Sequence, residues 1–110
     1  MEFILYDHST NTRQTIEVDA DPVTIGRDDD CVISLKSPFV ARKHAQIIRK
    51  GNQLFVETLS RAGTRVANLE ISPGKPVRID FGDEVQVAQF SIAALSPGKK
   101  AVASADKREM

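Results

Sequence analysis

The sequence predicts an all-β domain, either a sandwich or a barrel, from three observations. Apolar and polar residues alternate with a period of two along most of the chain, which is typical of strands. Turn-forming residues separate these runs every ~8–12 residues. No segment before residue 96 carries apolar residues at helical spacing. We therefore expect about eight to eleven short strands, and a chain of 110 residues suits one compact domain.

The runs that we expect to be strands begin close to the N-terminus. A fully apolar run at residues 3–6 comes first, and alternating runs follow at residues 15–18 and 23–25. Lys50-Gly51-Asn52-Gln53 separates two further runs and predicts a hairpin turn. Gly82-Asp83 predicts another turn. The remaining runs cover residues 32–35, 45–49, 54–59, 77–81, 85–88 and 90–93.

The composition changes after residue 95. Residues 96–110 contain almost nothing to bury, so we expect a domain at 1–95 followed by a flexible linker or tail. Ser-Pro-Gly-Lys occurs at residues 72–75 and 96–99, but neither copy has the spacing of a phosphate-binding P-loop. Both copies are better explained as turns.

Charge and composition exclude several classes of function. The chain has 15 basic and 15 acidic residues, so its net charge gives no general attraction to nucleic acid. Its single cysteine, Cys31, follows no metal-ligand pattern and is expected to be a buried thiol. No basic leader and no run of ~20 apolar residues is present. We expect a cytoplasmic domain with no catalytic activity, no cofactor, no metal and no membrane insertion.

Three polar clusters lie where apolar runs end and should therefore lie on loops. They are Gly26-Arg27, Ala41-Arg42-Lys43-His44 and Ser60-Arg61-Ala62-Gly63-Thr64. Arginines gathered on loops indicate a local anion-binding surface. A histidine at a loop–strand junction more often braces the loop than binds a ligand. The run at residues 28–30 is expected to be a solvated acidic loop, because calcium-loop spacing is absent.

Taken in order, these clusters resemble the forkhead-associated (FHA) domain family. The family pattern Ile-Gly-Arg is matched by Ile25-Gly26-Arg27, Ser-x-x-His-Ala by residues 41–45 (Ala-Arg-Lys-His-Ala here), Ser-x-Asn-Gly-Thr by residues 60–64 (Ser-Arg-Ala-Gly-Thr here), and a final Gly-Asp by Gly82-Asp83. The resemblance covers roughly residues 2–95. It implies a sandwich of two twisted, mainly antiparallel sheets with its binding loops at one end. It also implies recognition of phosphothreonine in extended peptides, with Arg27 donating hydrogen bonds to the phosphate.

The resemblance, together with the positive charges on or beside the proposed loops, predicts two groups of site residues. Those expected to face a peptide or protein partner are Arg27, Ala41, Arg42, Lys43, Arg61, Ala62 and Arg65. Those expected to brace the loops are Gly26, His44, Ser60, Gly63 and Thr64.

Two expected ligand donors are missing. Ala41 stands where the family has a serine, and Ala62 stands where it has an asparagine. Losing one charge-assisted and one neutral hydrogen bond costs roughly 2–4.5 kcal/mol, or about 30- to 1,500-fold in affinity. The leading hypothesis is therefore an interaction module with weak or lost phosphothreonine recognition. Two alternatives are a functional phosphopeptide-binding module that uses Arg27, Arg42 and Arg61, and a regulatory domain of a larger kinase, secretion or pilus ATPase, or transporter.

Overall fold

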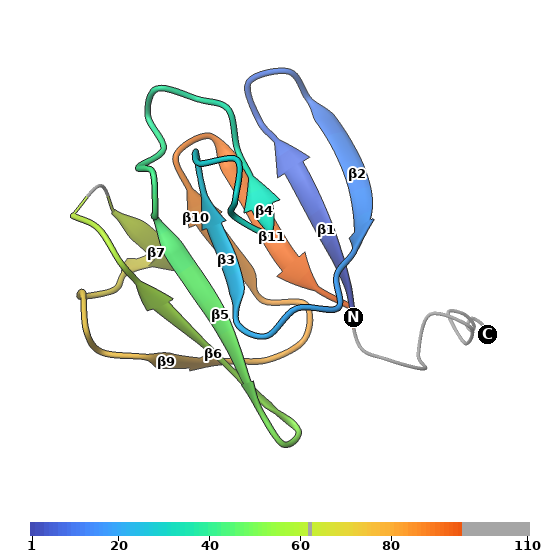
Figure 1. Cartoon of the computed structure of the whole chain (residues 1–110), viewed down its shortest axis with the longest axis vertical. Coiled ribbons are helices and arrows are strands. Elements are labelled where there is room, and N and C mark those ends of the chain that lie inside the picture. Colours follow the sequence, from blue (N-terminus) through green and yellow to red (C-terminus); the bar gives the residue numbers. More distant parts are fainter. Residues whose placement is uncertain (62, 96–110) are drawn as a thin grey trace.

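The computed structural model describes residues 1–61 and 63–95, which fold into two β-sheets (Figure 1). One sheet has the strand order β2-β1-β11-β10-β7-β8, and the other has the order β4-β3-β5-β6-β9. The all-β prediction is confirmed, as a sandwich. The strands are β1 (Glu2–Asp7), β2 (Thr12–Glu17), β3 (Val23–Gly26), β4 (Ile33–Ser34), β5 (Ala45–Lys50), β6 (Gln53–Thr58), β7 (Thr64–Val66), β8 (Leu69–Glu70), β9 (Val77–Ile79), β10 (Glu84–Val87) and β11 (Phe90–Ala94). The predicted tail at 96–110 lies outside the described residues, as does Ala62.

Almost all strand pairs are antiparallel. The hairpins β1–β2, β5–β6 and β10–β11 follow directly along the chain. The pair β3–β4 is parallel. The β5–β6 hairpin turns at Lys50-Gly51-Asn52-Gln53, as predicted, with Gly51 in the left-handed region at φ 62°. Because β1 pairs with β11, the N-terminal strand closes the first sheet onto the last strand of the domain.

The core follows from the alternation in the strands. Phe3 of β1, Ile25 of β3 and Val56 of β6 are each fully buried. They belong to one cluster to which both sheets contribute, which is how a sandwich forms its interior. Cys31 is also buried, as predicted.

Some elements differ from the sequence prediction. The second strand begins at Thr12, three polar residues before the predicted run at 15–18. These three residues also pair with β1, and the strand therefore extends to the β1–β2 turn. The run at 77–81 ends as a strand at Ile79, since Asp80 enters a turn in which its N–H donates to Oδ2 of Asp83 at 2.8 Å. The short strands β7 and β8 were not predicted. Within the part of the chain that the structure describes, no helix has the length and apolar character needed to cross a bilayer.

Candidate functional site

The three polar clusters meet at one end of the sandwich. Ile25 pairs with Ala45, and Ala45 pairs with Thr58. The end of β3, the start of β5 and the end of β6 therefore lie at the same end of one sheet. The first cluster follows β3, the second precedes β5 and the third follows β6. Pairing of these three strands therefore places residues distant in sequence on neighbouring loops.

His44 joins the second and third clusters. Its side chain is fully buried. The N–H of Ala41 donates to Nδ1 at 3.1 Å, and Nε2 donates to the carbonyl oxygen of Gly63 at 2.7 Å. Since Nδ1 accepts, the ring carries its proton on Nε2 in this arrangement. The geometry agrees with a bracing role, because one imidazole connects two loops through their backbones.

Gly26 permits close contact between the first two clusters. A Cβ atom at this position would lie 2.1 Å from the carbonyl oxygen of Arg42. The N–H of Arg27 donates to the carbonyl of Ala41 at 2.9 Å, and the N–H of Asp28 donates to that of Arg42 at 3.3 Å. The loop after β3 is thus hydrogen-bonded to the loop before β5 along its backbone, at a spacing that only glycine allows.

Two threonines hold the third cluster. Thr64 is fully buried, and its Oγ1 donates to Oγ1 of Thr58 at 2.9 Å. The hydroxyl of Thr58 lies within hydrogen-bond distance of the carbonyls of His44 and Ser60. Buried hydroxyls with hydrogen-bond partners stabilise a loop, whereas unpaired ones destabilise it. These contacts tie the exit of β6 to the entrance of β5.

The acidic run is mainly exposed, as predicted, and its carboxylates are also ion-paired. Asp28 lies 3.6 Å from Nε of Arg42, and Asp30 lies 3.2 Å from Nζ of Lys43. Asp29 binds the ammonium of Lys36, a residue that the sequence analysis did not select. The Lys36 ammonium lowers the pKa of Asp29, and the hydrogen bond to Asp30 raises the pKa of Lys43. Each of the three carboxylates thus faces a cation from the segment between β4 and β5.

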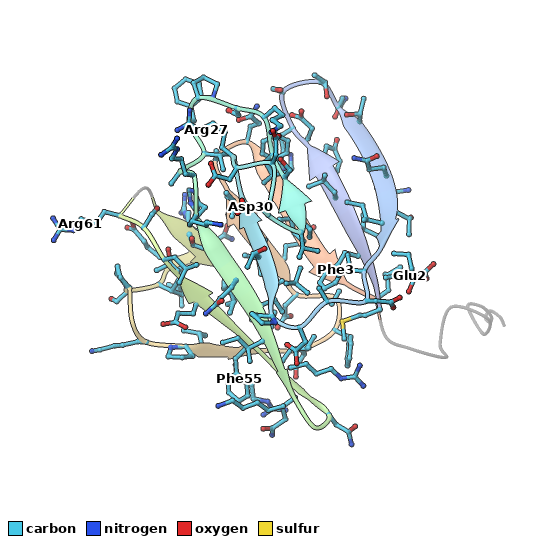
Figure 2. All side chains as sticks on the ribbon, in the orientation of Figure 1. Glu2, Phe3, Arg27, Asp30, Phe55 and Arg61 are labelled. Carbon is cyan, nitrogen blue, oxygen red and sulfur yellow. The ribbon has the colours of Figure 1, made fainter. Side chains whose placement is uncertain are left out.

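The remaining arginines do not gather at one point. Figure 2 shows Arg27 at the loop end of the molecule, whereas the Arg61 side chain projects outward at another edge. Both side chains are exposed, and neither makes an ion pair with any described residue. Arg65 donates from Nη2 to the carbonyl of Asn68 at 3.4 Å. Arg27 belongs to the first cluster and lies next to the second. Among the described residues, its guanidinium has no ion-pair partner.

Ala41 occupies the centre of this surface without a polar side chain. Its N–H is bound to His44 and its carbonyl to Arg27, so its backbone is fully used inside the protein. The methyl group is partly buried. A ligand that reached this position would meet no donor from the residue itself.

Sequence reasoning also missed an exposed apolar side chain near the loops. Phe39 lies between β4 and β5 and is 75% exposed. It lines a shallow depression with Ala88, Gln89 and Ser9. No periodic pattern marks this residue, because it lies in a loop. The one signal in the sequence was an aromatic residue next to a proline within a predicted loop.

Comparison with known proteins identifies this arrangement. The family model for the FHA domain matches residues 23–88. The FHA domain-containing protein FhaB of Mycobacterium tuberculosis is 26% identical over 91 residues, which is 82% of this chain and 57% of FhaB. The chain thus spans only about half the length of this curated relative.

Solved structures agree on the fold. EmbR of Mycobacterium tuberculosis, in complex with a low-affinity phosphopeptide, superimposes with a TM-score of 0.69 and 26% identity, over 88% of this chain and 25% of EmbR. The N-terminal FHA domain of S. cerevisiae Rad53p, in complex with a phosphothreonine peptide, superimposes with a TM-score of 0.72 and 17% identity, over 93% of this chain and all (100%) of that one. The fold, the family-model match over residues 23–88 and the two loops joined by His44 show that this chain belongs to the FHA domain family.

Proposed function

We propose that this chain is a protein-interaction module of the FHA type whose recognition of phosphothreonine is weakened. The observation that carries the proposal is Ala41, a methyl group at the junction of the loops where the family pattern has a hydroxyl. Arg27 remains as an exposed cation beside it. The partner class is a protein or peptide, and phosphothreonine contributes only part of the affinity. EmbR, which is 26% identical, supports this class because it was solved with a phosphopeptide.

The ion pairs of the second cluster support the same conclusion. Arg42 and Lys43 face Asp28 and Asp30, so a phosphate that approaches them competes with a carboxylate already in place. Exposed pairs of this kind contribute little to stability, because solvent and salt screen the charges. The carboxylates also remain near the ligand after displacement and repel its negative charge. These cations therefore compensate only partly for the missing hydroxyl.

Calorimetric titration with phosphothreonine peptides tests the proposal. We expect the native chain to bind far more weakly than a low-micromolar module, in line with the loss of about 30- to 1,500-fold calculated above. Ala41→Ser should raise the affinity, because the hydroxyl enters a site whose backbone is already fixed. The unphosphorylated peptide is the matched control. Low-micromolar binding by the native chain that disappears with Arg27→Ala would contradict the proposal.

A second candidate is a functional phosphopeptide-binding module that uses Arg61 in place of a lost donor. The exposed guanidinium of Arg61, without an ion pair among the described residues, favours it. This candidate requires that the loop after β6 turns Arg61 toward Arg27 when peptide binds. It predicts steep salt dependence and loss of binding on Arg61→Ala. Equal binding by the native chain and Arg61→Ala would remove it.

A third candidate is that the module regulates a longer protein. Its support is that FhaB and EmbR are both longer than this chain, which spans 57% and 25% of their lengths. The sequence of the complete reading frame tests it directly. A reading frame without another domain would remove this candidate.

A further inference from the structure

One edge of the six-stranded sheet is formed by a long, regular strand. Strand β2 lies at this edge and pairs with β1 over six consecutive residues without a bulge. The other edge strands in the described sheets, β4, β8 and β9, have only two, two and three residues. Natural edge strands are usually protected from pairing by proline, charged side chains, bulges or short length. Strand β2 has no proline, lysine or bulge, and its two charged residues, Arg13 and Glu17, have opposite signs.

The hydrogen-bond pattern identifies which backbone groups of β2 face outward. The N–H of Val18 donates to the carbonyl of Met1 at 2.8 Å, and the Met1 ammonium donates to the carbonyl of Val18 at 2.9 Å, which makes these two residues a hydrogen-bonded pair. Hydrogen-bonded pairs alternate along an antiparallel ladder. Residues 12, 14 and 16 therefore bond to β1, and the N–H and C=O groups of Arg13, Thr15 and Glu17 point away from the sheet.

These three outward-facing residues can pair with the same three residues of a second copy that runs in the antiparallel direction. If a second β2 pairs antiparallel around a two-fold axis at Thr15, Thr15 faces Thr15, and each Arg13 faces the Glu17 of the other copy. All three residues then form hydrogen-bonded pairs. Shifting the register by one further pair either way leaves a charged residue without its counterpart. The centred register is therefore favoured by backbone and charge together.

The side chains of these residues share the solvent-facing surface of the sheet. Phe3 and Ile16 are directly paired, and Phe3 is buried, so Ile16 lies on the core side. Residues alternate between faces, so Arg13 and Glu17 lie on the outer face. Glu17 is 60% exposed even though it binds the N-terminal ammonium at 3.1 Å. Opposite charges in hydrogen-bonded positions can thus meet without burial.

We propose that this chain forms a symmetric homodimer in which β2 of one copy extends the sheet of another. The two-fold axis reverses the direction of β2. Because the β1–β2 turn lies at the same end of the sandwich as the loops that follow β3 and precede β5 (Figure 1), the dimer presents its two sets of these loops at opposite ends. It would join two partner molecules rather than clamp one peptide. Two linked weak sites also gain avidity on a partner that is itself oligomeric.

Sedimentation equilibrium over a wide range of concentration tests the dimer. The native chain should move toward twice its mass of 12.1 kDa as concentration rises. Thr15→Pro should prevent this, because proline removes an N–H that points outward and leaves the ladder to β1 intact. Circular dichroism checks that this variant is folded. Arg78→Glu, on the short edge strand β9, is the matched control and should dimerise as the native chain does.

Charge exchange gives a second and independent test. Arg13→Glu and Glu17→Arg should each remain monomeric, because like charges then face each other across the two-fold axis. An equimolar mixture of the two variants should form a heterodimer, since positions 13 and 17 then carry opposite charges in both of the pairs that join the two chains. A native chain that stays monomeric at millimolar concentration would overturn the proposal. A dimer that neither Thr15→Pro nor Arg13→Glu weakens would overturn it equally, because another surface would then be responsible.

Discussion

Removal of the His44 side chain should destabilise the fold far more than removal of the other histidine. His44→Ala leaves the Ala41 N–H and the Gly63 carbonyl without their partner. A buried polar group left unpaired costs about 1–3 kcal/mol, and the lost packing of a fully buried ring adds about 1 kcal/mol. With two such groups, we expect the free energy of unfolding to fall by about 3–7 kcal/mol, a large share of the 5–15 kcal/mol typical of a domain.

Urea unfolding followed by circular dichroism measures this change. His8→Ala is the matched control, since His8 is exposed and its ring bonds Oγ of Ser91 at 2.7 Å beside a stacked Tyr6. The control should lose about 1 kcal/mol or less. His44→Phe separates packing from hydrogen bonding, because it keeps a ring but bonds neither loop, and it should remain strongly destabilised. Equal losses for His44→Ala and His8→Ala would refute the bracing role.

Three further substitutions or reactions test other features. Gly26→Ala should lower the free energy of unfolding by at least about 2 kcal/mol, because its Cβ would collide with the Arg42 carbonyl, and calorimetric melting measures the loss. Ala88→Gly should raise it by about 0.5–1 kcal/mol, because residue 88 has φ 53° in the left-handed region, and a lower melting temperature would contradict this. Burial raises the pKa of the Cys31 thiol, so less thiolate is present at pH 8, and alkylation should be much slower in the native state than in denaturant.

The fold could be predicted because its signals are local. Period-two alternation marks the core strands, and Gly51 marks the hairpin turn that the structure confirms. The strands β7 and β8 escaped prediction because their turn uses Ala67 and Asn68, both at positive φ, where a glycine would have been the expected signal. Their pairing to β10 and to each other, rather than their own composition, holds them in the sheet.

The candidate site was predictable in its scaffold but not in its charges. His44 was expected to brace a loop, and its two backbone contacts agree with that expectation. The pairing of Asp29 with Lys36 could not be predicted, because it depends on how two loops approach across the sheet edge. The direction of the Arg61 side chain likewise could not be predicted, because no periodic pattern covers the loop after β6.

The separation between scaffold and donors makes the proposed loss of affinity testable in isolation. Ala41 already uses its N–H and its carbonyl within the protein, so the serine variant changes only what the side chain offers. Gly26 and His44 hold the loops through backbone contacts that need no ligand. A gain of phosphothreonine binding in Ala41→Ser, with an unchanged melting temperature, would therefore report the missing hydroxyl itself. An altered melting temperature would instead show that position 41 also contributes to the shape of the loop.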